Sequence, residues 1–272
     1  MANTEFPFDD DYRTLAFDPK LLEEELAEET LSDPLDDLDS FSSNTTDSAD
    51  KCDIGLELLQ GNHQQQMEGL RIFCQHRDPR SILFLLPLLN AVCPIQRMSA
   101  VCALGRNPSP LAVEILLTLL HNDSNGYIRK AVAWTLGKSY STAPILNPLI
   151  KSLRSDIAAV RLRASSSLAD AGCVSQVPAD LAAVELLLSI CIDNEPAVRS
   201  SSIWSLSRIY VMLLDSRKKE AIYIVNQAVL YDPDYTVRDE ARMMLELFED
   251  STILDLNLID IEEDWINEPD TL

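Results

Sequence analysis

Apolar and small residues recur at positions +3, +4 and +7 after an arginine at several places along the chain. After Arg129 these positions hold Val132, Ala133 and Leu136, which fall on one side of a helix. A similar pattern follows four further arginines, Arg97, Arg161, Arg199 and Arg238. The five arginines are 32, 32, 38 and 39 residues apart. A period of this length is typical of an array of stacked helical pairs.

Each repeat is predicted to contain two helices, of which the second follows the arginine. The first helices are expected near 111–120, 144–153, 181–192 and 217–230. Ahead of them, an imperfect pair is expected over 54–59 and 64–76, and then an apolar stretch over 80–92 that Pro87 interrupts. The predicted fold class is therefore all-α: a right-handed α-solenoid of about five helical pairs.

An aspartate recurs in the predicted turn between the two helices of a repeat. It precedes the repeat arginine by five or six residues in four pairs: Asp123 with Arg129, Asp156 with Arg161, Asp193 with Arg199, and Asp232 with Arg238. Such an aspartate can accept hydrogen bonds from the amides that open the second helix, and it can also meet an arginine of its own or an adjacent repeat. We expect these eight residues to form a structural ladder rather than a catalytic site.

A second recurrent feature is a large side chain at +5 from the repeat arginine and a cation at +9. It occurs in three pairs: Trp134 with Lys138, Trp204 with Arg208, and Cys102 with Arg106. Residues four apart share one face of a helix, and this face lies away from the apolar stripe. Aromatic residues and arginine dominate protein-binding surfaces, and cations select acidic partners. We expect an exposed surface for an acidic or amphipathic protein partner; packing of each tryptophan between repeats is the alternative.

Charged residues are unevenly placed along the chain, whose net charge is −22. Residues 1–50 contain 16 acidic and 2 basic residues, 51–248 contain 19 and 20, and 249–272 contain 9 and none. A nearly neutral body thus has two acidic tails. This balance opposes nucleic-acid binding, which needs a strongly basic face.

The same boundaries define three predicted parts of the chain. Residues 1–50 are expected to be an acidic, mostly disordered tail, because their charge is high and they have few apolar residues to bury. Residues 51–248 are expected to form the solenoid. Residues 249–272 alternate aliphatic and acidic side chains. This last pattern fits either a terminal cap of the solenoid or an acidic docking segment, and both remain open.

Signatures of catalysis, metal binding and membrane insertion are missing from the sequence. The six cysteines form no C-x-x-C motif and are interpreted as reduced thiols of a cytoplasmic protein. None of the three histidines, His63, His76 and His121, is followed by glutamate, and no phosphate-binding or nucleophile-elbow motif occurs. No apolar run approaches about 18 residues. We expect no catalytic residue, no metal, no cofactor and no membrane span.

A turn aspartate, then Val-Arg, small residues and an apolar +7 position together resemble the HEAT repeat. Residues 130–137 and 200–207 resemble more narrowly the short repeats of cyanobacterial phycobilin lyase subunits and their relatives. The resemblance covers about 60–248 and implies that second helices line a concave groove. It also implies a non-catalytic scaffold or adaptor, accessory to iron–sulfur or bilin cofactor assembly in a cyanobacterium. The alternative that it implies is a phycobilin lyase or lyase-like chaperone of the phycobilisome, with a bound bilin.

Overall fold

The computed structural model describes residues 47–246, and the expectations for residues 1–46 and 247–272 fall outside this range. Within 47–246 every regular element is a helix, as the all-α prediction requires. None of these helices is both long and apolar enough to cross a lipid bilayer. The described residues form two compact units, which divide between Ser167 and Leu168 inside the helix α10 (Ala158–Gly172).

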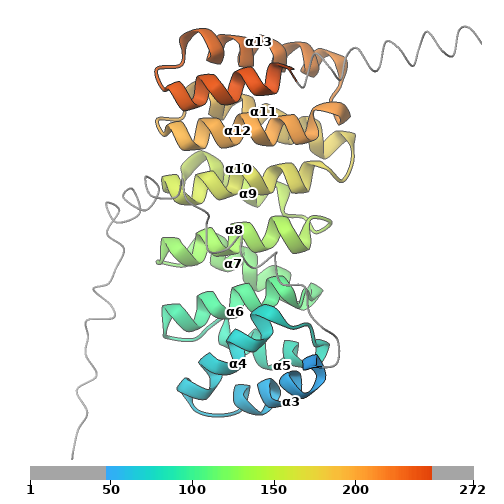
Figure 1. Cartoon of the computed structure of the whole chain (residues 1–272), viewed down its shortest axis with the longest axis vertical. Helices are drawn as coiled ribbons and strands as arrows, with labels where there is room; N and C mark the ends of the chain where they lie inside the picture. Colours follow the sequence, from blue (N-terminus) through green and yellow to red (C-terminus); the bar gives the residue numbers. More distant parts are fainter. Residues whose placement is uncertain (1–46, 247–272) are drawn as a thin grey trace, which may run out of the picture. The chain divides into compact units, whose positions relative to one another are not determined.

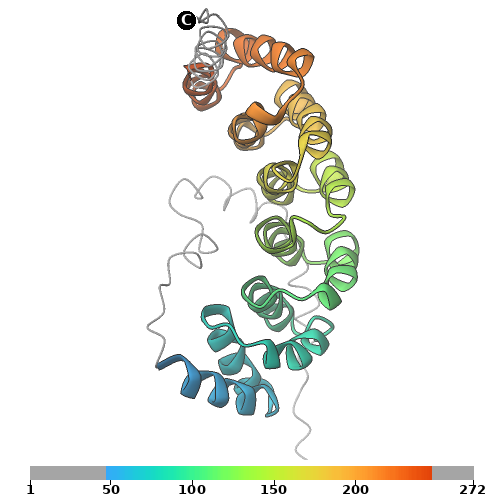
Figure 2. The ribbon, with the colours of Figure 1, turned by 90° about the vertical axis from the view of Figure 1, so that its right-hand side faces the viewer.

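Unit 1, residues 47–167, is a stack of helical pairs (Figure 1). Its α-helices before α10 are α3 (Asp47–Leu59), α4 (His63–Gln75), α5 (Ile82–Leu88), α6 (Pro94–Arg106), α7 (Val113–Asn122), α8 (Gly126–Tyr140) and α9 (Leu146–Ser155). Short 3₁₀ turns, η2 (Pro79–Ser81) and η3 (Pro110–Ala112), precede α5 and α7. The second helices α4, α6 and α8 pack side by side in one row, and α7 packs against α8 and α9 (Figure 2).

The apolar stripe that follows each arginine forms the core of unit 1. Val132, Ala133 and Leu136 of α8 are fully buried, and so are their counterparts in α6. Side-chain caps set where these helices begin. Asn62 and Gln65 form a capping box at the start of α4, and the side chain of Asn125 accepts a hydrogen bond from the amide of Tyr127 in α8.

Unit 2 contains α11 (Gln176–Ile192), α12 (Pro196–Ile209), η4 (Tyr210–Met212), α13 (Asp215–Tyr231) and a last helix over 235–246. α11 packs against both α12 and α13. Figure 2 shows α12 and the helix of 235–246 in one row, and α11 and α13 in the other. Ile203 and Leu206 of α12 are fully buried, as the repeat pattern predicts.

Some helix boundaries differ from the sequence-based prediction. α3 begins at Asp47, inside the predicted tail 1–50, and buries Cys52 and Leu59. α11 begins at Gln176, five residues ahead of the expected start. Pro178 lies in its first turn, where the missing amide hydrogen leaves no helical bond unmade.

Candidate functional site

The repeat arginines of unit 1 link consecutive turns. The Nε and Nη2 groups of Arg97 donate to the two carboxylate oxygens of Asp123 at 2.9 and 3.0 Å. Arg129 binds Asp156 in the same way, at 2.9 and 2.6 Å. Both pairs join an arginine to the turn aspartate of the following repeat. The carboxylate therefore pairs with the arginine of the repeat before its own.

Each arginine also binds the backbone of its own turn through the remaining nitrogen. Nη1 of Arg129 donates to the carbonyl of Asp123 at 2.8 Å, and Nη1 of Arg161 donates to the carbonyl of Asp156 at 2.9 Å. The turn aspartates in addition cap the next helix. A carboxylate oxygen of Asp123 accepts from the amide of Asn125 at 2.9 Å. One arginine and one aspartate thus satisfy polar groups in two successive turns.

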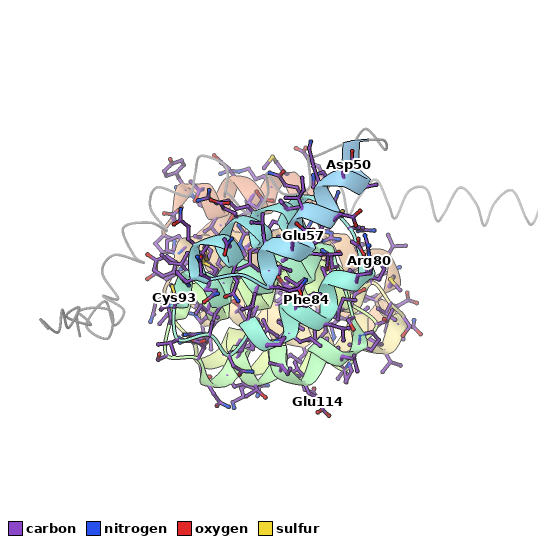
Figure 3. The ribbon with its side chains drawn as sticks, turned by 90° about the horizontal axis from the view of Figure 1, so that it is seen from below. Asp50, Glu57, Arg80, Phe84, Cys93 and Glu114 are labelled. Carbon is purple, nitrogen blue, oxygen red and sulfur yellow. The ribbon has the colours of Figure 1, made fainter. Side chains whose placement is uncertain are left out.

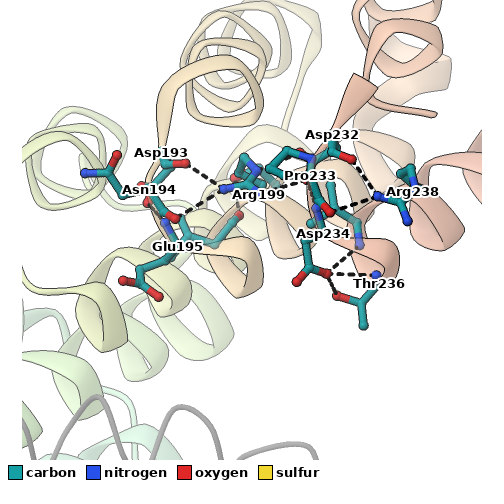
Figure 4. A network of polar contacts seen from close by, with 12 residues as sticks. Asp193, Asn194, Glu195, Arg199, Asp232, Pro233, Asp234, Thr236 and Arg238 are labelled. Atoms are coloured by element: carbon teal, nitrogen blue, oxygen red, sulfur yellow. Dashed lines mark hydrogen bonds and ion pairs between the residues drawn. The ribbon is translucent and has the colours of Figure 1, made fainter. Parts of the chain in front are cut away.

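Unit 2 repeats this arrangement (Figure 4). Arg199 donates to both carboxylate oxygens of Asp232 at 2.7 Å, and its Nη1 donates to the carbonyl of Asp193 at 2.9 Å. Arg238 donates in turn to the carbonyl of Asp232 at 2.7 Å. The Arg199 and Asp232 side chains are only 7% and 6% exposed. The hydrogen bonds that Arg199 donates to Asp232 raise the pKa of Arg199, so its guanidinium stays charged at every physiological pH.

The first turn of unit 1 uses a variant of the ladder that the sequence pattern missed. Arg80 lies beside α3 (Figure 3), where its guanidinium pairs with Asp53 at 2.8 Å and with Asp78 at 2.6 Å. The same arginine holds the pKa of Asp78 below its ordinary value. Here aspartate and arginine are two residues apart, so a search at a spacing of five or six cannot find them.

Polar side chains at the C-terminal ends of the second helices α6 and α8 also make contacts that the sequence pattern did not predict. The side chain of Asn107 accepts from the amide of Asp78 at 2.7 Å and donates to the carbonyl of Phe73 at 2.9 Å. The hydroxyl of Tyr140 donates to the carbonyl of Leu104 at 3.2 Å and accepts from the amide of Ser109 at 3.1 Å. Asn107 and Tyr140 lie at different offsets, +10 and +11, from their repeat arginines and differ in residue type, so the repeat pattern alone does not identify them.

Two of the expected partner-binding residues are buried, which corrects the expectation of an exposed +5 face. Trp134 is only 7% exposed and Cys102 only 9%. The Trp134 ring lies against Gly105 of α6, since a Cβ atom built there would be 3.5 Å from the indole. Glycine leaves room for this ring between adjacent second helices. At Trp134 the alternative, packing between repeats, is what the structure shows.

The Trp204–Arg208 pair of α12 differs from Trp134 because it is exposed. Trp204 is 43% exposed, and the guanidinium carbon of Arg208 lies 5.1 Å from the centre of its ring. Arg208 also pairs with Asp170 at 2.7 Å. Met243, at +5 from Arg238, is exposed as well, on the neighbouring helix of 235–246 in the same row (Figure 2). We call Trp204, Arg208 and Met243 the Trp204 face.

The two remaining cations lie in unit 1. Lys138 is exposed at the end of α8. Arg106 is half-buried, and its Nε donates to the carbonyl of Gln75 at 3.3 Å. The arrangement expected for both, an aromatic or sulfur side chain exposed next to the cation, does not occur at these positions because Trp134 and Cys102 are buried.

The titratable side chains of 47–246 include no cluster of three or more histidine, cysteine or acidic residues that could hold a metal ion. Cys74 and Cys102 are neighbours, but burial raises the pKa of both thiols, that of Cys102 to about 11. A groove of about 550 Å³ lies between the ends of α11 and α13. Its charged lining includes Arg199 and Asp232, which already bind each other.

Comparison with known sequences agrees with this architecture. The chain matches the family described as HEAT repeats over residues 82–169 and again over 146–246. It belongs to the HEAT-repeat family. These matches extend into both units and include the Arg97–Asp123, Arg129–Asp156 and Arg199–Asp232 pairs. No curated protein matches the sequence.

Solved structures with a similar fold are armadillo and HEAT-type solenoids. A designed armadillo repeat protein in complex with the peptide (KR)4 has 17% identity and a TM-score of 0.56, with 74% of this chain and 100% of that chain covered. A computationally designed armadillo repeat protein for modular peptide recognition has 16% identity, a TM-score of 0.52 and coverages of 72% and 99%.

A natural example is a chain from a structure of Kap95p binding to RanGDP, with 16% identity and a TM-score of 0.53. The match covers 87% of this HEAT-repeat chain and 34% of the other chain. This chain therefore spans about a third of the length of the other chain. At such low identities the similarity establishes the fold alone.

Proposed function

We propose that this HEAT-repeat protein is a non-catalytic scaffold or adaptor that binds a protein partner through the Trp204 face. HEAT and armadillo folds are typical of protein-binding scaffolds, because rows of helices present an extended surface. The similar structures described above include a peptide complex and a protein complex. The observation that supports the proposal most strongly is the exposure of Trp204, since the tryptophan at the equivalent position of α8 is buried.

The chemistry of the Trp204 face defines the partner that it fits. A half-exposed indole with a guanidinium over its ring offers a large contact area and few rotatable bonds, as binding hot spots do. Asp170 already engages one side of Arg208. A partner segment that places an apolar side chain on Trp204 and Met243 and a carboxylate next to Arg208 would satisfy the face. This describes an acidic or amphipathic contact surface.

The resemblance of residues 130–137 and 200–207 to phycobilin-lyase-type repeats supports a narrower proposal. On this proposal the adaptor acts in the cytoplasm of a cyanobacterium and assists the assembly of an iron–sulfur or bilin cofactor into its partner. Catalysis by the adaptor itself is not needed. A phycobilin lyase activity is the competing proposal, and it requires that the protein bind a bilin.

Affinity capture from the organism of origin, with quantitative mass spectrometry, tests the binding proposal. The unchanged chain is compared with Trp204→Ala, with Arg208→Glu, and with the control Thr118→Ala, which alters an exposed residue on α7. We expect at least one partner to fall about tenfold or more with both Trp204-face variants and to stay unchanged with the control. Equal capture by all four proteins would contradict the proposal.

Absorbance separates the adaptor from the lyase. The protein is co-expressed with the enzymes of bilin synthesis and then purified. An adaptor is expected to be colourless in visible light, whereas a lyase or bilin chaperone would retain the absorption of an open-chain tetrapyrrole.

A further inference from the structure

One side of α11 in unit 2 is apolar and exposed along its whole length. Five residues form this α11 stripe: Val177, Leu181, Val184, Leu188 and Cys191. Val177 is 70% exposed, Leu181 49% and Leu188 43%. Beyond Gln176, every exposed position of α11 is apolar, and Ile192 next to the stripe is 67% exposed. The stripe lies opposite the side of α11 that packs on α12 and α13, so it is no part of the core of unit 2.

Two first helices of unit 1, α7 and α9, present polar side chains at their exposed positions. In α7 these include Glu114, which projects outward in Figure 3, and Thr118. In α9 they include Asn147, Lys151 and Arg154. The repeat architecture therefore does not require apolar residues there. A continuous exposed apolar strip of this kind marks a surface that another element covers.

The spacing of the α11 stripe selects a helix as that element. Its residues are separated by 4, 3, 4 and 3 positions, which is the a/d seam of a coiled coil. Knobs from a second helix fit the holes between such residues. From Val177 to Cys191 the seam is about 21 Å long at 1.5 Å per residue.

The size of the seam favours a tethered helix over a second copy of the chain. A stable interface between separate proteins buries roughly 800 Å² on each side. A contact one helix wide, about 10 Å, and about 21 Å long is well below that area. A segment of the same chain needs less contact, because its effective concentration at the seam can be millimolar.

The C-terminal part of the chain has the matching pattern. Leu254, Leu258, Ile261 and Trp265 are separated by 4, 3 and 4 residues, the same order of spacings as in the α11 stripe. Three acidic residues, 262–264, precede the tryptophan. Lys219, exposed on the adjacent α13, is a cation that they can approach.

The last described helix ends on the side of unit 2 where α11, and with it the α11 stripe, begins. Arg217, near the start of α13, pairs with Asp180, near the start of α11. The last helix, 235–246, runs back along α13 and so ends at this side (Figure 1). Seven residues separate it from Leu254, and eight peptide steps reach roughly 26 Å. A helix that starts at Leu254 can therefore reach the Val177 end of the seam, whereas the Cys191 end lies about another 21 Å away. The docked helix must then run in the same direction as α11.

We propose that residues 254–265 dock as a helix on the α11 stripe, parallel to α11. Leu254 then meets Val177, Leu258 meets Leu181, Ile261 meets Val184 and Trp265 meets Leu188. This contact is separate from the Trp204 face and does not depend on the function proposed for that face.

Disulfide trapping in the full-length chain tests the contact. Leu181→Cys and Leu258→Cys are combined in a background with Cys173→Ser and Cys191→Ser, which removes the two exposed native thiols of 47–246. The matched control combines Leu258→Cys with Thr118→Cys on α7. Mild oxidation is followed on non-reducing gels, and the linked peptides are identified by mass spectrometry. We expect an intramolecular 181–258 disulfide to form at least about tenfold faster than the 118–258 disulfide.

Hydrogen exchange gives an independent readout without cysteines. Leu181→Glu with Leu188→Glu changes exposed side chains, so unit 2 remains folded, and we expect amide exchange over 254–265 to rise about tenfold or more. Equal disulfide rates in the two cysteine pairs, or unchanged exchange, would overturn the proposal. A covalent dimer formed by Leu181→Cys alone would overturn it in favour of a second copy at the stripe. Lack of amide protection over 254–265 in the purified, unsubstituted protein would overturn it in favour of a helix from another protein.

Discussion

The repeat arginine is a connector that uses the full geometry of its guanidinium group. In Arg199, Nη1 binds the carbonyl of its own turn while Nε and Nη2 bind the carboxylate of Asp232 in the next turn. The ammonium group of a lysine has no fixed fork and cannot make these bonds in the same plane. The ladder therefore depends on arginine itself and not on positive charge alone.

Loss of a buried ladder pair should lower stability much more than loss of an exposed pair. For Arg199→Ala we expect the free energy of unfolding of unit 2 to fall by about 3 kcal/mol, because the carboxylate of Asp232 stays buried without its partner. The control is Arg242→Ala, whose pair with Asp239 is more than half exposed and should contribute less than about 1 kcal/mol. Urea unfolding measures both values, and equal losses would show that the ladder is not a main source of stability.

Thiol reactivity should separate the cysteines by their surroundings. Burial raises the pKa of Cys102 to about 11, so at pH 8 only about one thiol in a thousand is ionised, and the side chain is also shielded. Cys173, between α10 and α11, is exposed. We expect a maleimide reagent to modify Cys173 at least about a hundredfold faster than Cys102, as followed by mass spectrometry. In urea the two rates should converge; similar rates in the folded protein would contradict the packing of α6.

At the scale of helices, the sequence pattern predicts well which residues enter the core. It predicts less well whether the face that holds the +5 position is buried or exposed. The +3, +4 and +7 positions are buried in α6, α8 and α12, because any helix of a pair must bury that stripe. Trp134 and Trp204 hold the same +5 position, yet one is buried and the other exposed. The difference depends on the facing side chains, such as Gly105 opposite Trp134, and these come from a separate repeat.

Close contact between helices also explains the glycine at +8 in α8. A Cβ atom on Gly137 would lie 2.6 Å from the Cβ of Ser167, and the Ser167 hydroxyl donates to the carbonyl of Ala133 at 2.8 Å. Any side chain at this position would push α8 away from α10 at Ser167.

Gly137→Ala should therefore destabilise unit 1, although alanine favours helices over glycine. We expect a loss of about 1–3 kcal/mol, the range for overpacking a close contact. Gly105→Ala is the control, since its nearest atom would be the Thr135 hydroxyl at 3.3 Å. Thermal unfolding of both variants measures the difference. Greater stability of Gly137→Ala than of the unchanged protein would mean that the helices can separate without loss.

At the scale of the whole molecule, the spacing of the arginines was sufficient to predict stacked helical pairs. It did not predict that the described residues form two compact units that divide inside α10, because a period counts repeats and does not measure the contacts between them. The ladder spacing was equally visible in the sequence. The exposure of Trp204 was not visible in the sequence, since exposure depends on neighbouring helices. Four of the six expected binding residues belong to unit 1, and only Trp204 and Arg208 belong to unit 2.

The central claim is that a protein partner binds at the Trp204 face, and site-specific photo-crosslinking in living cells tests it most directly. A photoreactive phenylalanine analogue replaces Trp204 in one strain and Thr118, the exposed α7 residue, in another. We predict a discrete crosslinked product from position 204, absent from position 118 and lost when Arg208→Glu is added. Crosslinking to the same proteins from both positions, or to none from position 204, would contradict the claim.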